Sequence, residues 1–244
     1  MSTTFNKNLK LYLMEALGLA IFMISACFFG GILEAKNSFI HQSIHNDFAR
    51  QIIMGIMMGL TALFIFYSKW TAPSGSHINP AVSLAFLRVG RINKNDTFFY
   101  IIFQFIGGTV AVYLMQLLMG HTLTDAPVNS VATVPGKAGP FPALVTEFII
   151  AFIMMTMVLF TSSNEQLKKY TRIIAGIMVC LYVIIAGPMS GFGMNPARTF
   201  ASALPSHTWT AFWLYIFMPI AGMLSATEFF LFFQNKKINK NLVY

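Results

Sequence analysis

Six long apolar stretches constrain this chain more than any other feature of its sequence. About 20 apolar residues in a helix cross the roughly 30 Å hydrocarbon layer of a bilayer. Only 10% of the residues are charged, whereas soluble domains carry about 25%. The sequence therefore predicts an all-α membrane protein with six transmembrane helices. The stretches cover residues 9–33, 49–69, 96–120, 142–162, 171–188 and 209–233.

Basic residues cluster beside the ends of these stretches, on alternate connections. The formal net charge of +8 could suggest a nucleic-acid partner, but the charge follows the span ends, as the positive-inside rule describes. We therefore expect both termini to be cytoplasmic and no nucleic acid to bind. The compact chain favours a bacterial inner membrane. The clusters are Lys7 and Lys10; Arg88, Arg91 and Lys94; Lys168, Lys169 and Arg172; and Lys236, Lys237 and Lys240.

Two shorter apolar pieces, 79–88 and 195–204, both begin with Asn-Pro-Ala. Neither is long enough to cross a membrane, so each is expected to be a re-entrant half-helix that dips in from one side. Asn is a favourable residue just before a helix, and Pro is favourable at the first helical position because its missing N–H would be unbonded there anyway. The two triplets are Asn79, Pro80 and Ala81, and Asn195, Pro196 and Ala197.

The contexts of these triplets match each other. Shifting residues 74–85 by 116 positions places them on 190–201, where both serines, both glycines and both triplets coincide. Glu15 and Glu147 also correspond, each early in the first span of its half. Because each half has three spans, an odd number, the second half must enter the membrane inverted relative to the first.

We therefore expect one transmembrane channel domain over residues 1–244, with inverted repeats at about 9–120 and 142–233. Inverted repeats bring matching points together near the midplane, so the two half-helices should meet with their N-termini. Each N-terminus carries about half a positive charge, which disfavours cations. The Asn79 and Asn195 amides can then donate to a passing neutral solute.

The segments "SGSHINPAV" and "SGFGMNPARTF" resemble the aquaporin, or major intrinsic protein, family. "QFIGG" at 104–108 and "WLYIFMPIAG" at 213–222 also look like family positions. The resemblance implies a passive channel for water and small neutral solutes that excludes ions and protons. It further implies no enzyme activity, no cofactor and no metal, and a homotetramer in the lipid bilayer with one pore in each protomer.

In this family a constriction outside the Asn pair is lined by four residues. Spacing from the triplets assigns them to Gly59, Val183, Phe192 and Arg198. Arg198 would donate to solute oxygens and repel cations, and Phe192 resembles the aromatic residue that packs the carbon skeleton of glycerol. Only the outer side carries a charge, because the first half has Val82 where the second has Arg198.

Two of these positions leave the solute open. Val183 stands where strict water channels commonly have His, and Gly59 stands where a bulky aromatic is typical, so the constriction should admit glycerol-sized solutes. Thr199 departs from the glycerol pattern, which usually has Asp there, so a functionally water-selective pore remains an alternative. Gly59 could instead be a packing glycine at a span crossing, with Met58 or Phe64 filling the space.

Three other polar residues are interpreted as loop anchors. In the family, the acids matching Glu15 and Glu147 accept backbone N–H groups from the re-entrant loops, and His77 should bond loop backbone. A proton relay would need further His or Asp neighbours.

Two other classes of function remain as alternatives. An intramembrane serine hydrolase could use His77 with Ser74, Ser76 or Ser190, but no G-x-S-x-G motif is present. An ion-coupled transporter would need cation sites where both half-helices present positive ends.

Overall fold

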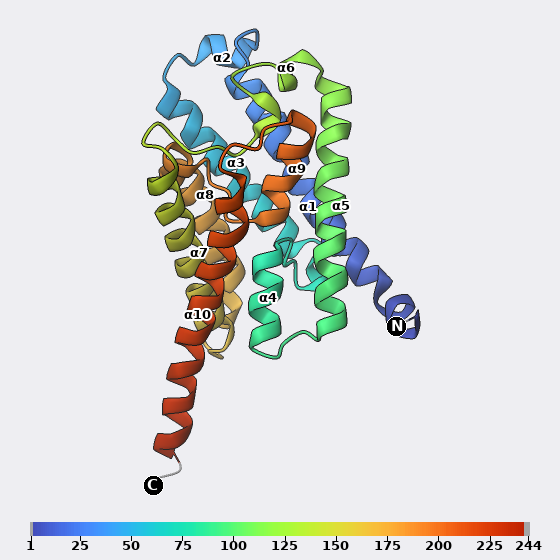
Figure 1. Ribbon diagram of the computed structural model, residues 1–244, viewed down its shortest axis with the longest axis vertical. Coiled ribbons are helices and arrows are strands. Elements are labelled where there is room, and N and C mark those ends of the chain that lie inside the picture. The colour runs from blue at the N-terminus through green and yellow to red at the C-terminus, as the bar shows by residue number, and fades with distance from the viewer. Residues whose placement is uncertain (1, 242–244) are drawn as a thin grey trace.

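A computed structural model describes residues 2–241, and the side chains of residues 5–235 within them. Every regular element in this range is helical (Figure 1). The predicted basic cluster of Lys236, Lys237 and Lys240 lies outside the described side chains. We call the end that carries the short helices α2 (Phe39–Ser43) and α6 (His121–Thr124) the outer end, and the end toward which the C-terminal helix extends the inner end.

Within residues 2–241, six helices are long and apolar enough to cross a membrane. The predicted six-span, all-α fold class is therefore confirmed. The first helix begins before its apolar stretch and the last ends after it, because polar residues prolong both helices beyond the part that hydropathy detects. The six are α1 (Ser2–Glu34), α3 (Asp47–Tyr67), α5 (Lys94–Met119), α7 (Pro140–Ser162), α8 (Thr171–Ser190) and α10 (Phe212–Asn241).

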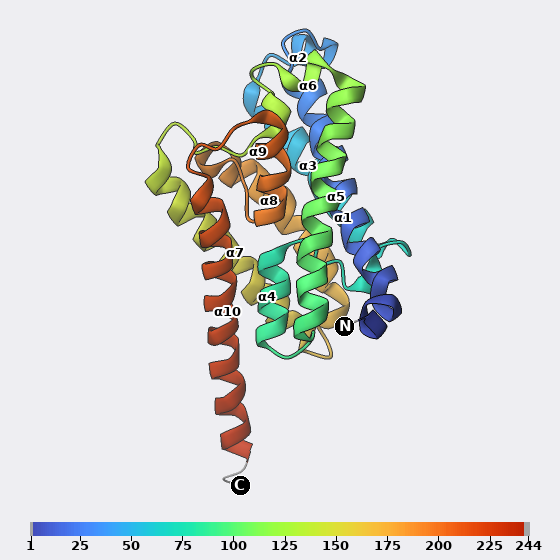
Figure 2. The same cartoon turned by 45° about the vertical axis from the view of Figure 1, so that its right-hand side comes forward.

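Two short helices, α4 (Pro80–Arg88) and α9 (Pro196–Ser206), begin at the Pro of each triplet. Asn79 Oδ1 accepts the Ala81 N–H at 2.9 Å, and Asn195 Oδ1 accepts the Ala197 N–H at 3.0 Å. These bonds satisfy N–H groups that the first turn of a helix leaves free. Figures 1 and 2 show α9 above α4, each running away from the middle of the molecule between the long helices.

The connection at 121–139, between α5 and α7, contains α6 and a 3₁₀ turn, η2 (Asn129–Val131). Two further turns flank the inner ends of the spans, η1 (Ala72–Ser74) and η3 (Lys168–Tyr170). The turn η1 leads directly into the chain before α4, so it connects a membrane-spanning helix to the first half-helix.

Glycines allow the long helices to approach closely. A Cβ on Gly107 of α5 would lie 2.2 Å from the Ala16 carbonyl oxygen of α1, and one on Gly222 of α10 would lie 2.5 Å from the Phe148 carbonyl oxygen of α7. Small residues bring backbones together in the same way in other membrane helices, where dispersion contacts replace the hydrophobic effect between spans. α1 and α7 are therefore fixed against their neighbours near Glu15 and Glu147.

Candidate channel site

The chain before each half-helix adopts a backbone conformation that residues other than glycine rarely take. Ile78 and Met194 have φ values of 44° and 48°, and Ser76 and Phe192 both have 50°. Left-handed backbone is unfavourable for residues with a Cβ, above all for β-branched ones such as Ile78. Such strain persists only where the surroundings hold the backbone in place.

Glu15 of α1 holds the first of these segments. Its carboxylate accepts the backbone N–H groups of His77 at 2.9 Å and Ile78 at 2.6 Å. It also accepts the Ser74 hydroxyl at 2.6 Å and the Gln104 amide at 2.8 Å. A fully buried carboxylate is costly without partners, and four donors surround this one.

Glu147 of α7 holds the second segment in the same manner. It accepts the Ser190 hydroxyl at 2.6 Å and the backbone N–H groups of Gly193 at 2.8 Å and Met194 at 2.5 Å. Glu147, like Glu15, has no exposed surface. Two tyrosines at matching positions complete the pair, since Tyr100 donates to the Ser74 carbonyl and Tyr215 to the Ser190 carbonyl, both at 2.7 Å.

His77 lies beside the first half-helix. Its Nδ1 is 3.1 Å from the Ser83 hydroxyl oxygen, and its ring stacks on Phe86 with the centroids 4.7 Å apart. The hydroxyl next to His77 thus belongs to Ser83 and not to Ser74, Ser76 or Ser190, the serines considered for a hydrolase. The Ser83 hydroxyl also accepts from the Gln104 amide, which the sequence did not mark as part of this network.

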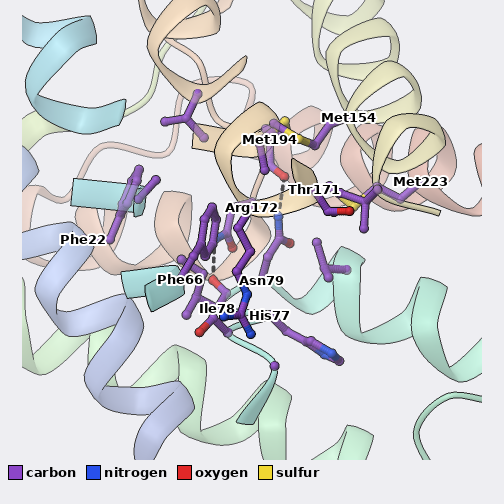
Figure 3. Close-up of a pocket in the computed structure, with 18 of the residues that line it drawn as sticks. Phe22, Phe66, His77, Ile78, Asn79, Met154, Thr171, Arg172, Met194 and Met223 are labelled. Atoms are coloured by element: carbon purple, nitrogen blue, oxygen red, sulfur yellow. Dashed lines mark hydrogen bonds between the residues drawn. The ribbon is translucent and has the colours of Figure 1, made fainter. Parts of the chain in front are cut away.

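The two triplets meet through reciprocal hydrogen bonds. Asn79 Nδ2 donates to the Met194 carbonyl at 2.8 Å, and Asn195 Nδ2 donates to the Ile78 carbonyl at 2.7 Å. Figure 3 marks the first of these bonds from Asn79 to Met194. Because an amide nitrogen carries two hydrogens, each Asn keeps one donor after bracing the opposite loop. Sequence reasoning expected the amides to face a cavity and did not anticipate this cross-brace.

An inner cavity of about 300 Å³ is lined by both Asn side chains (Figure 3). Gly75 and Gly193 contribute only backbone to its wall, so one side is polar main chain. The remaining lining is mostly apolar and comes from the long helices, including Phe66, Met154, Val179 and Met223.

An outer cavity of about 570 Å³ is lined by Met58 and Val183, among others. Three residues, Phe22, Phe192 and Arg198, line both cavities. The two cavities therefore adjoin at these three side chains. Phe22 was not predicted, because an apolar residue in a membrane helix gives no sign of whether it faces lipid or a cavity.

Arg198 is 9% exposed, and its Nη1 is buried with no hydrogen-bond partner among the described residues. An unpaired buried guanidinium nitrogen is costly, and here it lies at the junction of the cavities. Val82, at the matching position of the first half, lines the inner cavity. The charge is thus confined to the outer of the two half-helices.

The sequence profile described as "Major intrinsic protein" matches residues 2–230. The chain belongs to this family. Members of the family are membrane channels and not enzymes, and six helices in the described part of this chain are long and apolar enough to cross a membrane.

Named relatives and a solved structure agree with this assignment. The chain is 36% identical to aquaporin NIP1-2 of Arabidopsis thaliana over 70% of its own length and 59% of that protein, and 37% identical to aquaporin NIP1-4 of Oryza sativa subsp. japonica over 61% and 53%. It therefore spans less than two thirds of the length of these relatives. The X-ray structure of the aquaglyceroporin from Plasmodium falciparum shares the fold, with a TM-score of 0.76, 20% identity, and coverage of 91% of this chain and 95% of that one.

Gly59, expected at the constriction, lies at a helix crossing, whereas Val183, Phe192 and Arg198 each line at least one of the two cavities. A Cβ on Gly59 would lie 2.8 Å from Cys180 Cβ and 3.0 Å from the Gly176 carbonyl oxygen, so Gly59 packs where α3 crosses α8. It lines neither cavity, whereas Met58 lines the outer one. Phe64, the other residue considered, is 51% exposed on the outside of the bundle. Met58 precedes Gly59 by one residue, which is about 100° around a helix, so the two residues point in different directions.

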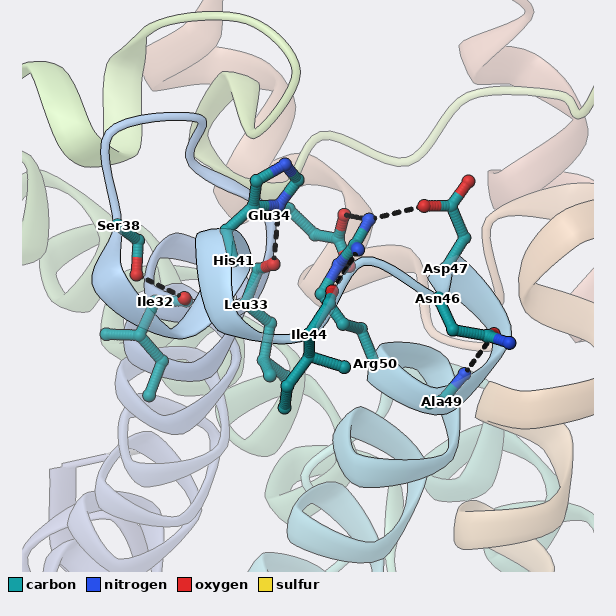
Figure 4. A network of polar contacts seen from close by, with 10 residues as sticks. All are labelled: Ile32, Leu33, Glu34, Ser38, His41, Ile44, Asn46, Asp47, Ala49 and Arg50. Carbon is teal, nitrogen blue, oxygen red and sulfur yellow. Dashed lines mark hydrogen bonds and ion pairs between the residues drawn. The ribbon is translucent and has the colours of Figure 1, made fainter.

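A polar cluster at the outer mouth of this channel was also missed. Arg50 pairs with Glu34 at 3.2 Å and Asp47 at 2.6 Å, and donates to the Ile44 carbonyl at 2.7 Å (Figure 4). These bonds fasten the connection between α1 and α3 over the outer cavity. Among the described residues, no three His, Cys, Asp or Glu side chains gather in a metal-binding arrangement.

Glu147→Gln tests the anchoring of the second loop. The amide would direct its NH₂ group at an N–H or O–H donor whichever way it turned, leaving buried groups unpaired at a cost of about 1–3 kcal/mol. We expect the midpoint of thermal unfolding in detergent to fall by about 2–4 °C for each kcal/mol lost. Glu165→Gln, on an exposed side chain, should leave the midpoint unchanged. An equal midpoint for both variants would contradict the anchoring role.

Proposed function

We propose that this channel conducts water and small neutral solutes such as glycerol down their gradients and excludes ions and protons. The observation that carries the proposal is the meeting of Asn79 and Asn195 beside an inner cavity that adjoins the outer one at Arg198. The names of the similar proteins, aquaporins and an aquaglyceroporin, agree with it. Matching contacts of Glu15 and Glu147 support the inverted repeat expected from the sequence.

The junction of the cavities suits a solute that is polar on one side and apolar on the other. Arg198 offers a donor nitrogen that has no partner in the described chain, so a solute hydroxyl or a water oxygen can accept from it. Phe22 and Phe192 offer apolar surface at the same place. In this arrangement the hydroxyl groups of glycerol would face Arg198 and its carbon atoms would face the two rings.

Exclusion of cations follows from the charges around the path. Each half-helix places about half a positive charge at its N-terminus, and the two N-termini meet at the Asn pair. Arg198 adds a full charge at the cavity junction. A cation, including protonated water, would lose hydration there without gaining anionic ligands.

A water-selective pore is the second candidate, and one observation favours it. The expected wide constriction depended on Gly59, but the structure brings Met58 to the outer cavity and Phe22 to the junction. Both side chains are larger than the glycine on which that expectation depended. A narrower passage retards glycerol more than water.

We further propose cytoplasmic termini and a homotetramer with one pore in each protomer. The basic side chains of the connections support the orientation, since Arg91 at the end of α4 contacts Ser162 and Ser163 at the end of α7, which places these two connections together at the inner end. Apolar side chains such as Leu117 and Phe141 are exposed on the outside of the bundle, where they can face lipid or another protomer.

Purified protein in liposomes tests the proposed function directly. Stopped-flow light scattering should show water and glycerol permeabilities well above those of empty liposomes, with no dependence on an ion gradient. Rapid water flux with background glycerol flux would instead establish the water-selective candidate. Background rates for both solutes would contradict a channel of either kind.

Arg198→Val tests the exclusion of cations. Removal of the charge that Arg198 places at the cavity junction should raise proton leakage at least about tenfold, equivalent to about 1.4 kcal/mol on the barrier. A pH-sensitive dye inside the liposomes measures the leak. Arg88→Val, which removes a half-exposed Arg paired with Glu228, is the control and should not leak. Equal leakage from both variants would remove Arg198 from this role.

Met58→Trp tests the corrected lining. The larger side chain should narrow the outer cavity and lower glycerol permeability about tenfold, with a smaller effect on water. Gly59→Ala should instead lower the midpoint of thermal unfolding, because its Cβ would meet the backbone of α8, and leave the ratio of the two permeabilities as it was. The opposite pattern would restore Gly59 to the constriction.

A further inference from the structure

Pro188 lies within the last turn of α8 and leaves that turn short of a hydrogen-bond donor. Proline has no backbone N–H, so the carbonyl four residues earlier loses its helical partner. That carbonyl belongs to Ile184, the neighbour of Val183, which lines the outer cavity. Within a membrane an unpaired backbone carbonyl must find another donor.

Gln51 of α3 supplies the donor. Its Nε2 lies 3.1 Å from the Ile184 carbonyl oxygen and 3.1 Å from the Val183 carbonyl oxygen. Because both partners are acceptors, only the NH₂ end of the amide can face them. Gln51 also lines the outer cavity, so the bond lies at the wall of the proposed pathway.

The surrounding residues make room for this contact. A Cβ on Gly187 would lie 2.8 Å from Gln51 Nε2, so glycine lets the amide reach the backbone of α8. A Cβ on Gly55, one turn along α3, would lie 2.8 Å from the Cys180 carbonyl oxygen. α3 and α8 are therefore in close backbone contact about one turn from Gln51, which lets its amide reach the backbone of α8.

The connection between α5 and α7 also contacts this turn of α8. The Gly136 N–H donates to the Met189 carbonyl at 3.0 Å, and a Cβ on Gly136 would lie only 1.9 Å from the Pro188 carbonyl oxygen. Gln51 and Gly136 thus hold the end of α8 between α3 and the connection. Gln51 is the one of the two that bonds the carbonyl of Val183.

We propose that Gln51 is a positioning residue of the constriction: its amide replaces the donor that Pro188 lacks and thereby fixes the turn of α8 that carries Val183. This inference rests on the proposed function, because it assigns the Val183 wall to solute selection. In this role Gln51 affects the width of the passage by fixing the position of Val183. Because Gln51 compensates for the N–H that Pro188 lacks, substituting both residues tests the proposal by rescue.

Gln51→Leu is the first test, measured as the ratio of glycerol to water permeability in liposomes. Without the Gln51 donor the turn of α8 that carries Val183 is no longer fixed. Displacement of Val183 then widens the passage, which increases the permeability of glycerol more than that of water. We expect the ratio to rise about threefold, the effect of losing one hydrogen bond between membrane helices. An unchanged or lowered ratio would overturn the proposal.

The double variant Gln51→Leu/Pro188→Ala tests the mechanism. Alanine restores an N–H to the Ile184 carbonyl within α8, so the ratio should return toward that of the unaltered channel. If the single variant fails to fold, the double variant should still fold and conduct with the original ratio. The compensation would be refuted if the two substitutions changed the permeability ratio additively. It would also be refuted if the double variant failed to fold as the single variant does.

Gln116→Leu is the matched control. Gln116 of α5 also uses Nε2 for two bonds, to the Ser130 hydroxyl at 2.9 Å and the Pro205 carbonyl at 3.1 Å. These bonds go to η2 and α9, and Gln116 lines neither of the two cavities. This variant should lose thermal stability without a change in the permeability ratio. A shift as large as that of Gln51→Leu would show a general structural effect and defeat the proposal. The unaltered protein is the reference in each experiment. If the unaltered protein fails to conduct, that result contradicts the proposed function and not the role of Gln51.

Discussion

Two buried carboxylates hold this structure in its form. A chain that turns back in the middle of a membrane leaves N–H groups with no water to bond, and Glu15 and Glu147 accept those groups on either side of the midplane. The same bonds maintain the left-handed backbone at Ile78 and Met194. The position of both half-helices therefore depends on acids in two of the long helices, α1 and α7.

The Asn cross-brace joins the two loops into one unit. Since Asn79 bonds the second loop and Asn195 the first, a displacement of either half-helix breaks a bond of the other. Each amide oxygen is also committed to its own helix, so the orientation of both side chains is fixed. The remaining hydrogen on each nitrogen is then an oriented donor in a rigid setting, which costs little to organise when a solute passes.

Local features of the sequence predicted much of this arrangement. Apolar length gave the six spans, and the Asn-Pro pairs gave both helix starts, because caps and spans are determined by nearby residues. Phe22 and Met58 could not be identified, since apolar residues face lipid and cavity alike. Spacing from Asn79 also could not show that Gly59 lies at the crossing of α3 and α8, since one residue turns a helix by about 100° and changes the neighbour it faces. The Gln51 bond needs partners that are distant in sequence.

The two halves differ in the partners of their polar side chains. In the first half, Gln104 donates to both Glu15 and Ser83, whereas the spacing of Tyr100 and Tyr215 places Pro219 at the matching position, which has no side-chain donor. In the second half Thr199 Oγ1 and Arg198 Nη1 are buried and have no partner among the described residues. Gln104 Oε1 of the first half is likewise buried without a partner in the described chain, but of these residues only Arg198 lines the two cavities. The proposed selection of solutes therefore rests on Arg198, a charge that the first half lacks because Val82 stands at the matching position.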